Sequence, residues 1–152
     1  MSEYTENHQD YFCVDGFMQW GPGWQQYQDM KKFFPGGYKI HITADPNQAA
    51  EVALVALPVL RQLNVYHKIV LNSGHYALLN RCSQQGKFIT VYAGPVMESF
   101  LNISKSLDEV LHENQFKPGP TPYKRLAVRS ETEQVTGNSN MLFYTTNVNY
   151  EL

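Results

Sequence analysis

The sequence has 152 residues, of which 43% are hydrophobic and 13% aromatic, and its formal net charge is −2. These values are typical of one globular domain over residues 1–152, and they exclude a disordered chain. The small negative charge provides no overall field to attract nucleic acid or a membrane surface, so neither is expected as a partner.

The start of the chain is polar and then rich in aromatic residues. Residues 1–10 are polar and acidic without an apolar stretch, so we expect a flexible tail and no signal peptide. Residues 11–18 indicate a strand that Gly16 interrupts. Residues 24–34 are compatible with a short helix or with an irregular aromatic flap.

The two cysteines and the longest apolar runs bear on the cellular compartment. Cys13 and Cys82 have neither metal-ligand nor disulfide spacing. No apolar run approaches the length that crosses a bilayer. We therefore expect a reduced, cytoplasmic protein, and export as an effector into a host cell stays open.

The stretch Tyr-Lys-Ile-His-Ile-Thr at residues 38–43 is predicted to be a buried strand. Because side chains alternate along a strand, Lys39 and His41 share one face, and Ile40 and Ile42 share the other. The apolar face is expected to anchor the strand in the core. The basic face is then held rigidly, where it can carry chemistry.

A long helix is predicted to follow this strand, over residues 45–63. Asp45 is a favourable N-cap, and Pro46 is favourable at the first helical position. Apolar residues then recur every three or four places. Pro58 inside this pattern predicts a kink.

The rest of the chain alternates strand and helix patterns. The predicted elements are a strand at 66–71, a short helix at 73–83, a strand at 87–93, a helix from 95 to 111, a rigid Pro-rich loop at 117–122, a short basic segment at 123–129, a polar loop at 130–140 and a final strand at 141–148. The order predicts an α+β fold, in which a small mixed or antiparallel sheet carries two long helices on one face.

Cations recur at the edge or on one face of successive predicted elements. They are Lys39, His41, Lys68, Arg81, Lys87, Arg125 and Arg129. If the strands at 38–43, 66–71 and 87–93 are neighbours, the first three converge on one face. Such a cluster repels itself unless it holds an anion, and arginine and lysine suit phosphate oxygens. We expect a phosphate clamp that includes Lys87.

The chemistry of this cluster follows from its residue types. A lysine crowded by other cations has a lowered pKa and can act as a general base, while histidine is a natural general acid near neutral pH. Without any metal, cofactor or nucleophile motif, these groups indicate β-elimination of phosphate. Taken singly, each cation is more often a solvated charge, His41 a hydrogen-bonded structural residue and Tyr92 a core aromatic.

Three stretches resemble known enzymes. Residues 38–43 resemble the Lys-x-His strand of bacterial phosphothreonine lyases. The longer stretch 37–60, followed by His-Lys-Ile-Val at 67–70 and Gly-Lys-Phe-Ile-Thr-Val-Tyr at 86–92, is more similar still to the lyase domain of class III lanthipeptide synthetases. The likeness covers residues 36–129, and it implies a phosphothreonine-lyase-like fold and a bacterial, metal-independent phosphoserine/phosphothreonine lyase without a cofactor.

The resemblance implies a role for each matching residue. Lys68 matches the general base that removes the Cα proton, and His41 matches the general acid that protonates the departing phosphate oxygen. Lys39 matches the lysine beside that acid, and Tyr92 a tyrosine that lines the pocket. The remaining phosphate-binding positions are Arg81, Arg125 and Arg129.

The chain also departs from the family pattern. Arg125 and Arg129 lie closer together than the family's late arginines, and residues 137–152 lack an expected Arg-Tyr-rich strand. No kinase module is visible, so a separate Ser/Thr kinase would supply the phosphorylated peptide or protein. These departures keep a second hypothesis open, a non-catalytic phosphopeptide-binding module that has retained the phosphate clamp.

Overall fold

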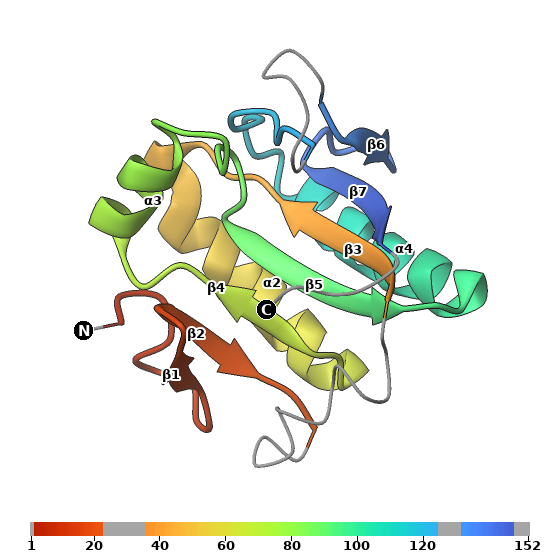
Figure 1. Cartoon of the computed structure of the whole chain (residues 1–152), viewed down its shortest axis with the longest axis horizontal. Helices are drawn as coiled ribbons and strands as arrows, with labels where there is room; N and C mark the ends of the chain where they lie inside the picture. The colour runs from red at the N-terminus through yellow and green to blue at the C-terminus, as the bar shows by residue number, and fades with distance from the viewer. Residues whose placement is uncertain (1, 23–35, 125–131, 148–152) are drawn as a thin grey trace.

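A computed structural model describes residues 2–22, 36–124 and 132–147 (Figure 1). It contains one seven-stranded sheet with the strand order β1-β2-β4-β5-β3-β7-β6, in which every pairing is antiparallel. The strands are β1 (Phe12–Val14), β2 (Phe17–Trp20), β3 (Gly37–Ile42), β4 (His67–Ile69), β5 (Ile89–Gly94), β6 (Gln134–Thr136) and β7 (Leu142–Asn147). The predicted α+β class is confirmed.

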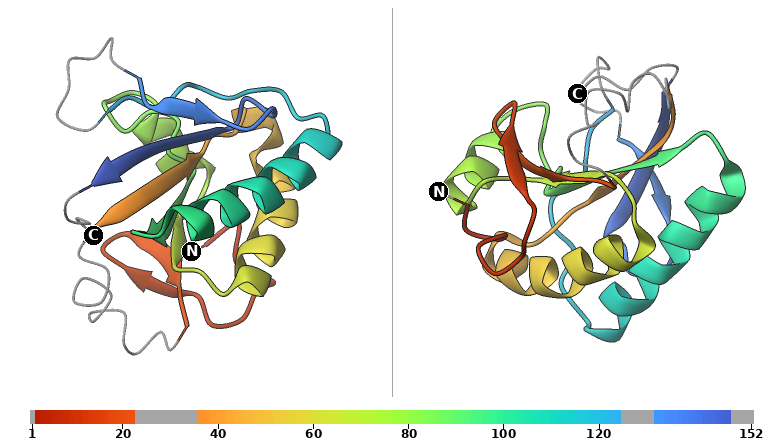
Figure 2. Two further views of the ribbon diagram at one scale, coloured as in Figure 1. Left: turned by 90° about the vertical axis from the view of Figure 1, so that its right-hand side faces the viewer. Right: turned by 90° about the horizontal axis from the view of Figure 1, so that it is seen from below.

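Two long helices cover one face of the sheet, α2 (Ala49–Leu63) and α4 (Met97–Glu113), and Figure 2 shows both on the same side. The short 3-10 helix η2 (Pro46–Gln48) leads into α2, and α3 (Ser73–Leu79) follows β4. As predicted, Asp45 caps this region, because its side chain accepts a hydrogen bond from the Asn47 N–H at 2.9 Å. Pro58 lies inside α2, which continues through it.

The core lies between these helices and the sheet. Its fully buried side chains include Ile40, Ile42, Leu57, Leu60, Ile69, Phe88, Ile89 and Leu107. The apolar stripes of both helices therefore pack on the inward residues of the central strands β3, β4 and β5. This packing fixes the backbone of the three strands, and with it the direction in which their outward side chains project.

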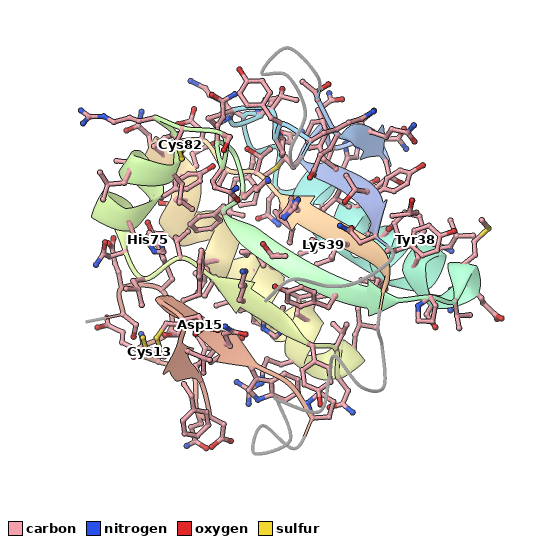
Figure 3. The ribbon with its side chains drawn as sticks, viewed as in Figure 1. Cys13, Asp15, Tyr38, Lys39, His75 and Cys82 are labelled. Atoms are coloured by element: carbon pink, nitrogen blue, oxygen red, sulfur yellow. The ribbon has the colours of Figure 1, made fainter. Side chains whose placement is uncertain are left out.

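The break predicted at Gly16 is a hairpin turn. Asp15 and Gly16 both have positive φ angles, 52° and 82°, and they join β1 to β2. Two successive residues of this kind form a turn whose twist matches that of the paired strands. Figure 3 shows this turn at Asp15, together with Cys13 and Cys82, which are free and exposed.

Two predictions about loops and tails were wrong. Residues 3–5, expected in a flexible tail, pack on the sheet: the Glu3 N–H donates to the Leu71 carbonyl at 2.7 Å, and Tyr4 packs edge-on against Phe88. The polar loop expected over 130–140 contains β6, which pairs with β7. Both errors have one cause, since these segments have no apolar period of their own and are ordered by long-range contacts.

Two predicted segments lie wholly or mostly outside the part of the chain that the structure describes. The helix or flap at 24–34 and most of the basic segment at 123–129 lie outside the described residues. Among the helices of the described part, none is both long and apolar enough to cross a membrane.

Candidate functional site

The candidate site lies on the face of the sheet turned away from α2 and α4. On β3, Ile40 and Ile42 point into the core and are fully buried, whereas Lys39 and His41 project to the opposite face. Figure 3 shows Lys39 on that face of the ribbon. The predicted alternation of an apolar and a basic face along this strand is confirmed.

The strand register places His41 and Lys68 in one row across the sheet. Thr90 on the central strand β5 is paired with His41 on one side and with Lys68 on the other. The row continues to Gln19 on β2 and to Phe143 on β7. Because directly paired residues of antiparallel strands point to the same face, Lys68 and His41 share a face and are separated by one strand.

Three side chains of this row, His41, Thr90 and Lys68, line a small pocket of about 60 Å³. That space is about enough for a few water molecules or one tetrahedral oxyanion. The lining residues are Phe17, Lys39, His41, Lys68, Leu79, Gln84, Lys87, Thr90, Glu133, Thr145 and Asn147. The structure therefore brings together His41 and three of the predicted lysines, one from each of β3 and β4 and one just before β5.

The Glu133 carboxylate is hydrogen-bonded to the ring of His41. The Nδ1 atom of His41 lies 2.7 Å and 2.9 Å from the two carboxylate oxygens of Glu133, and both side chains are buried. A carboxylate in this position accepts a hydrogen bond from the Nδ1–H, so that Nε2 is the ring nitrogen available to a molecule in the pocket. The pair has the arrangement of an acid–base histidine that a second residue orients.

The pKa of His41 responds to opposing influences. Burial lowers it below the usual histidine value, and the nearby charges of Lys87 and Lys39 act in the same direction. The Glu133 carboxylate raises it but does not overcome burial. An anion bound beside the lysines would add negative charge to the pocket and so would favour the protonated imidazole.

The three lysines have different surroundings. Lys39 and Lys87 are each only 7% exposed, and the Lys39 Nζ lies 5.8 Å from the centre of the Tyr92 ring. The Lys68 Nζ lies 4.2 Å from the centre of the Phe17 ring. Lys39 and Lys87 are buried and Lys68 is partly buried, and Glu133 is the one carboxylate among the described residues that line the pocket. Gathering three amines around one cavity favours a further negative charge there. The pocket is therefore suited to an anion.

The other predicted site residues either do not line the pocket or lie outside the described residues. Arg81 is exposed in the turn after α3 and does not line the pocket. Tyr92 is 4% exposed on β5, beside Lys39 in the register. Arg125 and Arg129 lie outside the described residues. Within the described ranges, no three His, Cys, Asp or Glu side chains are grouped so that they could hold a metal ion.

Sequence reasoning missed five polar residues that line the pocket, namely Gln84, Thr90, Glu133, Thr145 and Asn147. Glu133 lies in a polar segment without a pattern, and Thr145 and Asn147 lie on β7, where only a generic strand was predicted. Glu133 is 92 residues from His41 in the sequence. Because side chains alternate along a strand, the predicted strand at 141–148 has Thr145 and Asn147 on the same face. Nothing in the local sequence indicates whether this face is the one that lines the pocket.

Comparison with known protein families matches most of the chain. The family model described as the N-terminal domain of RamC matches residues 19–123, which is more than half of the chain and includes Lys39, His41, Lys68 and Lys87. No curated protein matches the chain. On the extent of the family match, the chain belongs to the RamC N-terminal domain family.

Proposed function

We propose that this protein is a metal-independent phosphoserine/phosphothreonine lyase, which eliminates phosphate from a phosphorylated peptide or protein. The observation that carries the proposal is the shared pocket of Lys68 and His41, one strand apart, with Lys39 and Lys87 beside them. This arrangement provides a base, an acid and an anion clamp in a space that suits one phosphate group.

The proposed reaction is a single elimination. The Lys68 amine takes the proton from Cα of the phosphorylated residue, and the electrons of that C–H bond form the Cα–Cβ double bond. The Cβ–O bond to phosphate breaks, and the departing oxygen receives the Nε2 proton of His41. The products are dehydroalanine or dehydrobutyrine in the peptide and inorganic phosphate.

Glu133 and the lysines have supporting roles in this proposal. The positive charges of Lys39 and Lys87 offset the charge of the phosphate. They also stabilise the negative charge that develops as Cα loses its proton. Glu133 fixes the tautomer and orientation of His41 and stabilises its protonated form, so it is a positioning residue. Phosphate binding next to His41 would promote the protonated state that the acid needs.

The family match supports a lanthipeptide-related context for this proposal. RamC is lanthipeptide-related, which agrees with the resemblance of residues 36–129 to the lyase domain of class III lanthipeptide synthetases. In that setting the substrate is a precursor peptide that a Ser/Thr kinase has phosphorylated. A host signalling protein as substrate is the corresponding expectation for an exported effector.

A non-catalytic phosphopeptide-binding module is the second candidate, and two observations favour it. The β7 side of the pocket presents the neutral side chains of Thr145 and Asn147, hydrogen-bonded to each other at 3.0 Å. The contact of the Lys68 Nζ with the Phe17 ring stabilises an ammonium group, which binds anions but does not accept a proton.

Mass spectrometry of a phosphothreonine peptide incubated with the protein and a chelator tests the proposal. A product one water lighter than the dephosphorylated peptide supports elimination without a metal. A product with a free hydroxyl group indicates hydrolysis and contradicts the roles of Lys68 and His41. Unchanged peptide that nevertheless binds favours the binding module.

A further inference from the structure

A second, larger hollow adjoins the cationic pocket at the side of β7. This groove of about 480 Å³ is lined by Tyr38, Lys124, Gln134, Tyr144, Thr145, Thr146 and Asn147. Its lining includes four consecutive residues of one strand, 144–147. Because successive side chains of a strand point to opposite faces, a groove that all four line runs along the edge of the strand.

This edge is the side of β7 that faces β6, and β6 pairs with only part of it. On its other side β7 is paired with β3 throughout, up to Asn147 opposite Gly37. Its pairing with β6 extends only from Leu142 to Tyr144, and within the described residues no strand continues that pairing past Tyr144. Figure 1 shows β7 between β3 and the short β6.

The backbone of Thr146 faces this open edge. The Met141 carbonyl accepts a hydrogen bond from the Thr43 N–H at 2.9 Å, so the peptide groups of Met141 point toward β3. In an antiparallel pair these directions alternate from residue to residue, so Thr145 also points toward β3, and Thr146 points away from it. The N–H and C=O of Thr146 are therefore directed into the groove.

The groove adjoins the pocket that His41 and the three lysines line. Thr145 and Asn147 line both of them. We propose that the groove binds a segment of the phosphopeptide that flanks the phosphorylated residue, and that this segment adds to the edge of β7 as an extra strand. This inference rests on the proposed function, because it takes the phosphopeptide as the occupant of the pocket.

The sheet spacing gives the distance between the two subsites. The phosphorylated residue must lie over β5, between Lys68 and His41, and an added strand lies three strand spacings away, beyond β3 and β7. At about 4.8 Å per strand this is roughly 14 Å, which an extended chain covers in about four residues. The groove therefore selects residues about four positions from the phosphorylated one.

The groove also indicates the chemistry of that segment. It must be extended, with a free peptide group to exchange hydrogen bonds with Thr146, as in other peptides that add a strand to a sheet edge. Lys124 is exposed at the groove and favours a carboxylate in the peptide. Tyr38 and Tyr144 offer ring surface to an apolar neighbour.

The test compares peptides of two lengths on two variants. The probes are mixtures with a central phosphothreonine and randomised flanks, one with about six residues on each side and one with a single residue on each side. Thr146→Pro removes the N–H that faces the groove and is tolerated on an open strand edge. Thr146→Ala, the matched control, removes only the side-chain hydroxyl. Binding is followed by fluorescence anisotropy, and elimination by mass spectrometry.

We expect the long probe to bind more tightly than the short one. Thr146→Pro should weaken only the long probe, by about threefold to tenfold, the effect of one backbone hydrogen bond, and should raise KM with kcat unchanged. If both probes bind equally tightly, the proposed peptide-binding groove is wrong. Elimination of phosphate in the same experiment would still support the lyase activity. If the long probe binds more tightly and Thr146→Pro reduces that binding, but no phosphate is eliminated, the result supports the groove and contradicts the lyase activity. The length dependence of the unaltered protein decides the question even if the proline variant fails to fold.

Discussion

Lys68 and His41 are the two direct cross-strand neighbours of Thr90, one on each side of β5. Their backbones are therefore about 10 Å apart, which is two strand spacings. In a phosphorylated residue the Cα proton and the departing oxygen are separated by only three bonds. The long side chain of a lysine can span the difference, and in the proposed reaction the central strand β5 would keep the two groups on opposite sides of the phosphorylated residue.

Lys68→Ala is expected to reduce elimination by about 10²- to 10⁴-fold, since the base contributes to the step in which the Cα proton is lost. The fold should be retained, because Lys68 is only partly buried and projects away from the core. Single-turnover mass spectrometry measures the rate. Lys105→Ala, an exposed lysine of α4, is the matched control and should behave as the unaltered protein. Full activity in Lys68→Ala would end the assignment of the base.

Glu133→Gln is expected to lower the activity and to move its pH dependence. Glu133 raises the pKa of His41 in opposition to burial, so loss of the carboxylate should lower that pKa further. The proton that His41 donates is then lost at a lower pH, and the alkaline limb of the pH–rate profile should shift to lower pH. Glu109→Gln on the exposed face of α4 serves as control. An unchanged profile with reduced activity would show that Glu133 has only a structural role.

Inorganic phosphate is expected to raise the melting temperature, because a ligand that binds only the folded state stabilises it by mass action. Lys87→Ala should reduce the increase, since this lysine is 7% exposed and lines the pocket. Arg81→Ala should reduce it less, because Arg81 is exposed outside the pocket lining. Thermal unfolding in phosphate and in chloride at equal ionic strength measures both. A larger loss with Arg81→Ala would reverse this ranking of the two cations.

His67 is expected to make the protein less stable in acid. Burial lowers its pKa to about 4, while its ring donates to the Val65 carbonyl at Nδ1 and accepts from the Tyr11 hydroxyl at Nε2, at 2.8 Å and 2.6 Å. The unfolded chain binds this proton more readily, so stability is lost as pH falls from about 6.5 to about 4, by roughly 3 kcal/mol.

Urea unfolding at several pH values between about 7 and about 4.5 measures this loss. His67→Gln should flatten the dependence, though not abolish it, because the lowered pKa of His41 acts in the same direction. His112→Gln, at an exposed position of α4, should leave it unchanged. Equal slopes in all three proteins would assign the acid sensitivity to other groups.

The sequence by itself determined the elements whose pattern is local. The alternation over residues 38–43 placed Lys39 and His41 opposite Ile40 and Ile42, because a strand has a period of two whatever it pairs with. The Asp45-Pro46 start and the apolar stripes located both long helices for the same reason.

Only the tertiary structure decided which distant residues meet. His41 and Glu133 are 92 residues apart, and their contact depends on the pairing of β3 with β7 and on the path of the chain into β6. Strand order and register are set by core packing and by long-range hydrogen bonds, which leave no periodic trace in a sequence. The cations could therefore be found by reading along the chain, whereas the carboxylate that orients His41 and the open edge of β7 required the assembled sheet.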